Sequence, residues 1–305
     1  MTSHATVGIA SHRFDFGYYR QAWWNWLIGA AFFFGEIGAG LFLVSLLTGY
    51  WPGLVAGYLI VMVGKNMAHL MYLGRPLRFW RAALRPDRSW IARGAWATGL
   101  FALSGLIILL PHLVGSEWTL NGWAGSTAHA VALLSSLFIM FYDGFVMNFS
   151  PSVAFWHSNL LPLLCFTYAA LGGTTVSLTL RELGGTLNND REMLLRVEYA
   201  LLAVNLVLLA VYMKRMSTWT ASARETVRLL LKGTYARAFL GLVVSMGLLA
   251  TLVLSIAHSQ IHAVWLVLLI AACELTGDFA LLMVLLRSGL FAPQTAPAHA
   301  KLLPQ

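Results

Sequence analysis

The sequence predicts an all-α integral membrane protein with eight transmembrane helices, grouped as two four-helix bundles. Hydrophobic residues make up 59% of the 305-residue chain, whereas charged residues make up only 10%. A soluble domain is about half apolar and about a quarter charged, so a soluble core does not explain this composition. The apolar residues also fall into separate runs of about 20, the length that a helix needs to cross a bilayer.

The runs divide the chain into a polar N-terminal segment (1–23), a membrane domain (24–287) and a loose C-terminal tail (288–305). The N-terminal segment lacks the pattern of a cleavable signal peptide. In lipid such runs become helices, because a helix satisfies its own backbone hydrogen bonds. In chain order, the predicted helices cover residues 24–48, 53–73, 94–114, 126–148, 157–178, 194–214, 238–258 and 262–287.

Two of the connections carry further signals. The stretch "SARETVRLLLKGTYAR" precedes the seventh span, and its basic residues alternate with apolar ones, which predicts an interfacial helix. Gly233 is expected to stop that helix. Only "SQI" separates the last two spans, so they are predicted to form a tight helical hairpin.

The positive charges are distributed unevenly between the two sides of the predicted membrane domain. With eight spans, both termini and the loops after the second, fourth and sixth spans lie on one side, here called face A; the other side is face B. Sixteen Lys and Arg residues belong to face A and three to face B. Positively charged loops stay in the cytoplasm. The sequence therefore predicts a bacterial inner-membrane protein with cytoplasmic termini. Membrane topology, rather than nucleic-acid binding, then explains the excess of basic over acidic residues.

A basic and aromatic cluster stands where the second span ends, at Arg75, Arg78, Trp80, Arg81 and Arg85. Membrane topology alone accounts for these arginines. Alternatively, they face lipid phosphates or the acidic surface of a partner protein. The sequence leaves both interpretations open.

Ionisable residues inside a span are costly, so each is a candidate functional residue. His69, Tyr142 and Asp143 are expected about 6–9 Å from face A, at ~1.5 Å of helix per residue. Glu36 and Lys65 are expected deeper, at about 13–18 Å, where they could pair. Such a pair is either structural or part of a proton path.

Glu274 and Asp278 lie four residues apart, so they share one face of the last span. Two carboxyls this close favour holding a proton, which predicts a proton path or a polar contact between bundles. Alternatively, they cap or pair with polar groups elsewhere in the chain.

The sequence offers few ligands for a bound redox group. A haem needs paired axial histidines, and His69 is the only histidine well within a predicted span. Cys165 and Cys273 are isolated, so we expect no iron–sulfur cluster, metal site or disulfide in this chain. A haem-b anchor nevertheless stays among the alternatives.

Several segments resemble, in the right order, the NrfD/PsrC family of membrane subunits from polysulfide-reductase-like complexes. The similar segments are "FFFGEIGAGLFLVS", "YLGRPLRFWRA", "SWIARGAW", "FYDGFVMNFSPSVAFWHSNLLPLLCFTYAALGG" and "LTGDFALLMVLLRSGLF". The resemblance implies a quinone-reactive anchor that binds menaquinone or ubiquinone and carries no haem or iron–sulfur cluster itself. It also implies an iron–sulfur partner subunit, usually connected to a molybdopterin catalytic subunit.

The resemblance implies specific quinone contacts. Tyr142 matches the tyrosine of the family's Tyr-x-Gly motif, a quinone-site residue. The chain departs from the family where Leu27, Ile28 and Ala31 replace a polar pair, and where Asp278 replaces a common glycine. We therefore expect the quinone site to be rebuilt around His69, Tyr142 and Asp143.

The main functional prediction is an anchor that passes electrons between the quinone pool and an iron–sulfur partner docked at face A. Several relatives dock that partner on the outer face, so the resemblance does not determine the side. The alternatives are a proton- or ion-translocating module that uses the buried charges, a haem-b anchor, and a purely structural anchor.

Overall fold

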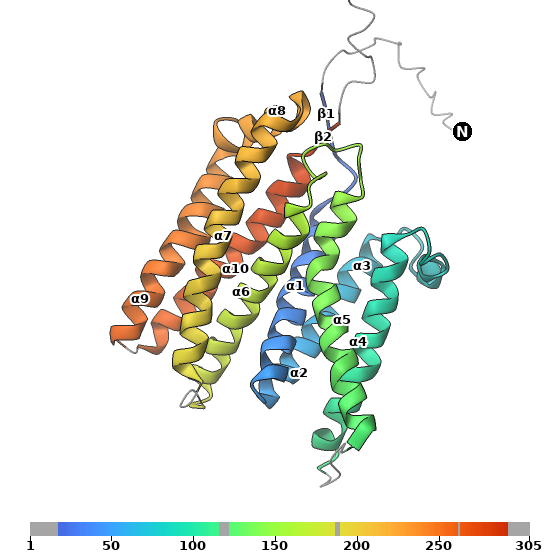
Figure 1. Cartoon of the computed structure of the whole chain (residues 1–305), viewed down its shortest axis with the longest axis vertical. Coiled ribbons are helices and arrows are strands. Elements are labelled where there is room, and N and C mark those ends of the chain that lie inside the picture. The colour runs from blue at the N-terminus through green and yellow to red at the C-terminus, as the bar shows by residue number, and fades with distance from the viewer. Residues whose placement is uncertain (1–17, 116–121, 187–189, 262, 292–305) are drawn as a thin grey trace, which may run out of the picture.

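The computed structural model describes residues 18–115, 122–186, 190–261 and 263–291 (Figure 1). The predicted N-terminal segment as far as residue 17, and the predicted tail from residue 292, lie outside this part of the chain. Within the described residues, eight helices are long and apolar enough to cross a membrane. The predicted all-α membrane fold with eight spans is therefore confirmed.

The second and seventh spans are each built from more than one helical segment. The second joins α2, η1 and α3, and the seventh joins η3 and α9; η1 and η3 are π-helical and η2 is a 3-10 helix. The described elements are β1 (Tyr19–Arg20), α1 (Trp26–Leu47), α2 (Trp51–Leu59), η1 (Ile60–Lys65), α3 (Asn66–Tyr72), η2 (Pro76–Ala83), α4 (Trp90–Leu113), α5 (Gly122–Asn148), α6 (Leu160–Leu183), α7 (Arg191–Trp219), α8 (Ala221–Leu231), η3 (Arg237–Ala250), α9 (Thr251–Ile261), α10 (Val264–Arg287) and β2 (Leu290–Phe291). The fifth and sixth spans run beyond their predicted ends, to Leu183 and Trp219.

Helix α1 lies in the middle of the molecule and contacts α2, η1, α3, α5, α6 and α10 (Figure 1). Its most extensive contact is with α6, where the backbones meet at Gly40 and Gly173. A Cβ atom added to Gly173 would lie 2.7 Å from the Gly40 Cα. Because α1 packs against helices from both halves of the chain, the grouping into two separate bundles stays a prediction.

The two ends of the described chain meet at face A. Strands β1 and β2 pair antiparallel, with Tyr19 opposite Phe291. The loop between α5 and α6 joins them through a bridge between Val153 and Phe291. The Trp156 indole also donates to the Leu285 carbonyl oxygen at 2.8 Å. A chain with an even number of spans has both ends on the same side of the membrane. The pairing of β1 with β2 therefore agrees with eight spans.

The predicted helix before the seventh span forms as α8. Thr220 caps its N-terminus by accepting a hydrogen bond from the Ala223 backbone at 3.2 Å. Its inner face buries Val227 and Leu230, and the Thr226 hydroxyl donates to the Ser288 carbonyl oxygen at 3.2 Å. Helix α8 therefore ties the sixth and seventh spans to the end of the eighth.

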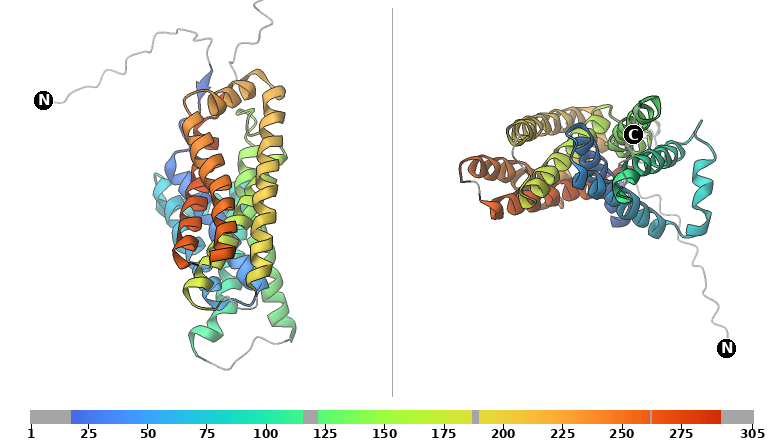
Figure 2. Two further views of the ribbon diagram at one scale, coloured as in Figure 1. Left: turned by 90° about the vertical axis from the view of Figure 1, so that its left-hand side faces the viewer. Right: turned by 90° about the horizontal axis from the view of Figure 1, so that it is seen from below.

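The arginine-rich connection between the second and third spans lies at the periphery (Figure 2). It contains η2, of which no residue is buried. The Trp96 indole donates to the Ala83 carbonyl oxygen at 3.0 Å, and Arg93 donates to that of Pro86 at 2.8 Å. These bonds hold the connection against the start of α4.

Face A is predicted to be cytoplasmic, and a reporter fused after Gln305 tests this orientation. A reporter active only in the cytoplasm should give signal, because positively charged loops resist translocation. The same fusion with a reporter active only outside the cytoplasm should stay silent. The reverse pair of results would place the arginine-rich face outside.

Candidate functional site

Four of the predicted site residues meet just inside face A, and we call Lys65, His69, Tyr142 and Asp143 the face-A polar cluster. Lys65 ends the π-helical segment η1, His69 follows on α3, and the other two lie on α5. A π-helical turn inside an α-helical span is frequent at functional sites. Lys65, Tyr142 and Asp143 are buried, and His69 is half-buried.

His69 and Tyr142 pack against the same side chain of α1. The centre of the Phe32 ring lies 6.4 Å from that of His69 and 6.3 Å from that of Tyr142. His69 Nδ1 lies 3.0 Å from the Lys65 carbonyl oxygen, so Nδ1 carries the hydrogen in that contact. In the neutral ring, Nε2 is then a hydrogen-bond acceptor.

Lys65 and Asp143 form the charged part of this cluster. The Lys65 ammonium lies 5.1 Å from the centre of the Tyr142 ring and is attracted by the Asp143 carboxylate. Both Asp143 oxygens are buried and make no hydrogen bond to any described residue. A buried carboxylate is costly unless a positive charge or a proton compensates it, so Asp143 depends on Lys65 or on protonation.

Glu36 and Lys65 are both buried, as expected for residues within spans. Among the described residues, no ion pair within 4.0 Å joins these two side chains. Glu36 interacts electrostatically with Asp143, and its Oε1 has no described hydrogen-bond partner. Lys65 is the last residue of the π-helical segment η1.

Glu274 and Asp278 face α6 from α10. A Cβ atom added to Gly172 would lie 3.1 Å from Asp278 Oδ2 and 3.4 Å from Glu274 Oε1. Both carboxyls are fully or almost fully buried, and the Tyr168 hydroxyl lies near them and near Glu36. We call Tyr168, Glu274 and Asp278, which lie next to α1, the mid-membrane carboxyl cluster.

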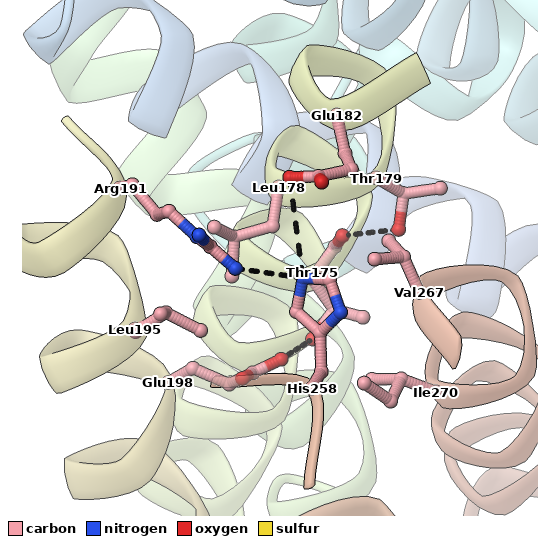
Figure 3. A pocket seen from close by; sticks show the side chains of 10 residues that line it. All are labelled: Thr175, Leu178, Thr179, Glu182, Arg191, Leu195, Glu198, His258, Val267 and Ile270. Carbon is pink, nitrogen blue, oxygen red and sulfur yellow. Dashed lines mark hydrogen bonds and ion pairs between the residues drawn. The ribbon is translucent and has the colours of Figure 1, made fainter. Parts of the chain in front are cut away.

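A pocket near face B contains polar residues that sequence analysis did not single out (Figure 3). It lies between α6, α7, α9 and α10, far along the spans from the face-A polar cluster. Its polar lining is Thr175, Thr179, Glu182, Arg191, Glu198 and His258. Glu198 could have been found, because it is a carboxyl within a predicted span. The approach of His258 to Arg191 joins two distant parts of the chain and leaves no local signal.

The predicted partner- or lipid-facing residues stay at the surface. All five lie in or beside η2 and are exposed. The Arg81 guanidinium lies 5.4 Å from the centre of the Trp80 ring. Within the described part of the chain, no group of three His, Cys, Asp or Glu side chains is placed to hold a metal ion.

Comparison with known families gives one match over nearly the whole chain. A family model described as "Polysulphide reductase, NrfD" matches residues 16–294. The match includes every residue of the face-A polar cluster, the mid-membrane carboxyl cluster and the face-B pocket. No curated protein matches the chain.

Proposed function

Since the chain belongs to the polysulphide reductase NrfD family, we propose that it is the quinone-reactive anchor of a multi-subunit oxidoreductase. The family consists of membrane subunits of polysulfide-reductase-like complexes, so a membrane anchor role follows from membership. The proposal adds electron exchange between the quinone pool and an iron–sulfur partner, which is connected to a molybdopterin catalytic subunit.

The face-A polar cluster is the observation that carries this proposal. A quinone carbonyl needs a hydrogen-bond donor, and a quinol hydroxyl needs an acceptor. The Tyr142 hydroxyl supplies a donor, and His69 Nε2 and the unpartnered Asp143 oxygens supply acceptors. The chemistry of these groups therefore fits either redox form of the head group.

Quinol oxidation releases two electrons and two protons, and quinone reduction consumes the same number. The electrons pass to or from the iron–sulfur partner. Asp143 or His69 takes a proton from a quinol hydroxyl, and the buried Lys65 ammonium stabilises the Asp143 carboxylate when it is charged. The proposed roles of the cluster are thus to orient the head group and to hold its protons.

The iron–sulfur partner is proposed to dock at face A, close to this cluster. Electron transfer needs a short distance between the quinone and the nearest iron–sulfur group. The exposed arginines Arg75, Arg78, Arg81 and Arg85 lie in the connection that leaves the membrane beside His69. Their positive charge suits an acidic partner surface or lipid phosphates. Such charges mainly raise the rate at which the partner associates and contribute less to its affinity.

Replacing Tyr142 with phenylalanine tests the quinone site. The change removes one hydroxyl and keeps the ring that packs on Phe32. Loss of one hydrogen bond costs about 0.5–1.5 kcal/mol, so quinone turnover by the assembled complex should fall several-fold. His69→Ala should lower it as well, while dye-linked activity of the catalytic subunit should stay unchanged.

Tyr235→Phe is the matched control for this test. Its hydroxyl also lies at face A and donates to the Arg287 carbonyl oxygen at 3.0 Å, but it is outside the polar cluster. Quinone kinetics of this variant should equal those of the wild type. Wild-type kinetics in both Tyr142→Phe and His69→Ala would contradict the proposed site.

A second candidate function, proton translocation, is favoured by the mid-membrane carboxyl cluster. Glu36, Tyr168, Glu274 and Asp278 lie near one another in the interior. If they relay protons, Asp278→Asn should slow quinone-coupled activity and leave dye-linked activity intact. Equal loss of both activities, with a poor yield of complex, would indicate a structural role.

The remaining alternatives have direct tests. A reduced-minus-oxidised visible spectrum of the purified chain should lack haem-b bands, and their presence would support the haem-b anchor. Binding of a quinone analogue to the purified complex should be measurable, and its absence would support the purely structural anchor.

A further inference from the structure

The face-B pocket holds a buried glutamate that the proposed quinone chemistry does not use. Glu198 is the eighth residue of α7, and only 1% of it is exposed. The Thr175 hydroxyl donates to its Oε1 at 3.1 Å (Figure 3). The space open to the centre of a water molecule in this pocket is about 10 Å³. That is room for about one water molecule beside the carboxyl.

His258 lies between a cation and an anion on the outer side of this pocket. Arg191 Nη2 is 3.2 Å from His258 Nε2, and Glu182 Oε2 is 3.9 Å from the same nitrogen. The Glu182 side chain is 16% exposed, whereas that of His258 is 3% exposed. Arg191 donates to Nε2 of the neutral imidazole, and a protonated Nε2 must give up this bond and donate to Glu182 instead. His258 thus lines the same pocket as Glu198 and lies within 3.9 Å of the partly exposed Glu182.

On its inner side, the pocket adjoins the mid-membrane carboxyl cluster. Thr175, which bonds Glu198, lies on α6 three residues after Gly172, where an added Cβ atom would lie 3.4 Å from Glu274 Oε1. Neither Glu274 oxygen makes a hydrogen bond to a described residue, and Asp278 lies next to it. Glu274 thus lies between the carboxyls of Glu198 and Asp278, and each of them is a neighbouring acceptor for its proton.

The same succession continues towards face A. The Tyr168 hydroxyl is buried without a described hydrogen-bond partner, one turn of α6 before Gly172. A Cβ atom added to Gly172 would contact Asp278 Oδ2 and the side chain of Ile37, the residue after Glu36. Beside Glu36, a Cβ atom added to Gly35 would lie 3.2 Å from Lys65 Cε, so this part of α1 adjoins the face-A polar cluster. These side chains come from α1, α5, α6 and α10, so the succession exists only in the folded chain.

We propose that Glu198 and His258 form the face-B opening of a proton path that runs through Glu274, Asp278, Tyr168 and Glu36. This inference rests on the proposed function, which supplies or consumes protons at Asp143. Each step moves one proton between oxygen or nitrogen atoms and transfers no electrons. At the opening, a proton leaves the Glu198 carboxyl for a water molecule in the pocket, passes to His258 and reaches water at face B by Glu182.

The test uses the whole complex in lipid vesicles that contain a quinol pool and an enclosed pH dye. Three quantities are measured on each preparation: dye-linked activity, quinol turnover, and protons moved across the membrane per electron. Glu198→Gln should lower protons per electron at least tenfold. Glu198→Asp keeps a carboxyl and should retain more than half of the wild-type ratio.

Glu192→Gln is the matched control, because Glu192 lies on the same helix but its side chain is 79% exposed. This variant should move protons as the wild type does. A wild-type ratio in Glu198→Gln overturns the inference, and so does a wild-type complex that turns over quinol without moving protons. Absence of quinol turnover in the wild type is a different result and contradicts the proposed function.

Loss of dye-linked activity in Glu198→Gln would mean that the variant assembles poorly. In that case His258→Asn is tested instead, and we expect the same tenfold loss of protons moved per electron. A wild-type ratio of protons per electron in His258→Asn would overturn the inference.

Discussion

Replacing Gly173 with alanine is expected to disrupt the packing of α6 against α1. The added Cβ atom would overlap the backbone of Gly40 and Leu41, and backbone atoms inside two packed helices cannot move aside separately. Overpacking of this kind costs about 1–3 kcal/mol or more. The thermal unfolding midpoint of the purified chain in detergent should fall, and so should the yield of assembled complex.

Gly99→Ala is the matched control for this prediction. Gly99 lies in α4, is exposed, and has no atom within 4 Å of an added Cβ atom. Alanine is favoured over glycine in a helix by about 0.5–1 kcal/mol, so this variant should be as stable as the wild type or more stable. If Gly173→Ala behaved in the same way, the backbone contact between α1 and α6 would be looser than the structure indicates.

The consequence of Gly173→Ala extends to the candidate site. Glu36 lies on α1 one turn from Gly40, and Cys165 and Tyr168 face it from α6. Separation of these helices would therefore move Glu36 away from its polar neighbours. Quinone-coupled activity should fall in any Gly173→Ala complex that still assembles.

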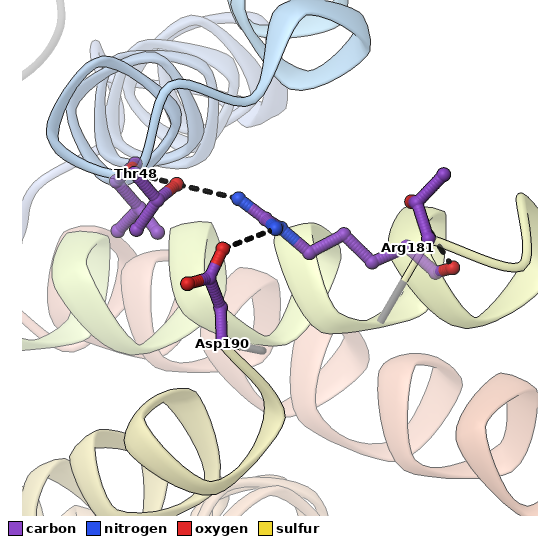
Figure 4. Close-up of polar contacts among 5 residues, drawn as sticks. Thr48, Arg181 and Asp190 are labelled. Atoms are coloured by element: carbon purple, nitrogen blue, oxygen red, sulfur yellow. Dashed lines mark hydrogen bonds and ion pairs between the residues drawn. The ribbon is translucent and has the colours of Figure 1, made fainter. Parts of the chain in front are cut away.

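Replacing Asp190 with asparagine is expected to be strongly destabilising at face B. Arg181 is buried there, and its guanidinium donates to Asp190 at 2.7 Å and to Thr48 at 2.6 Å (Figure 4). It also lies 4.2 Å from the centre of the Tyr50 ring. Asp190→Asn leaves this buried charge without its anion, which costs about 3–5 kcal/mol when a buried pair is broken.

Arg181→Met should cost less than Asp190→Asn, although it removes the larger side chain. The Asp190 side chain is 34% exposed, so water can solvate its charge once the arginine is gone. The large cost of breaking a buried pair comes from the buried charge that is left unpaired, and Arg181→Met leaves none. The double variant should consequently be more stable than Asp190→Asn alone.

Thermal unfolding in detergent measures this order of stabilities. Glu192→Gln again serves as control, because Glu192 and its partner Arg196 are both exposed, and such pairs contribute about 0–1 kcal/mol. Greater destabilisation by Arg181→Met than by Asp190→Asn would mean that hydrogen bonds and packing on Tyr50, rather than the buried charge, dominate this contact.

The sequence by itself determined the eight spans and the common side of both chain ends. Each apolar run is a local property, since about 20 apolar residues suffice to cross a bilayer wherever they occur in the chain. Glu36, Asp143, Glu274 and Asp278 could be chosen for the same reason, because any ionisable residue within such a run is conspicuous.

Only the tertiary structure decided which of these groups lie together. Lys65 interacts with Asp143 and makes no ion pair with Glu36, and it ends a π-helical segment that no local pattern revealed. His258, Glu182 and Arg191 come from three different helices, and their approach depends on how α6, α7 and α9 pack. Hydrophobicity determines that a helix enters the membrane, but contacts between helices determine which face it turns to each neighbour.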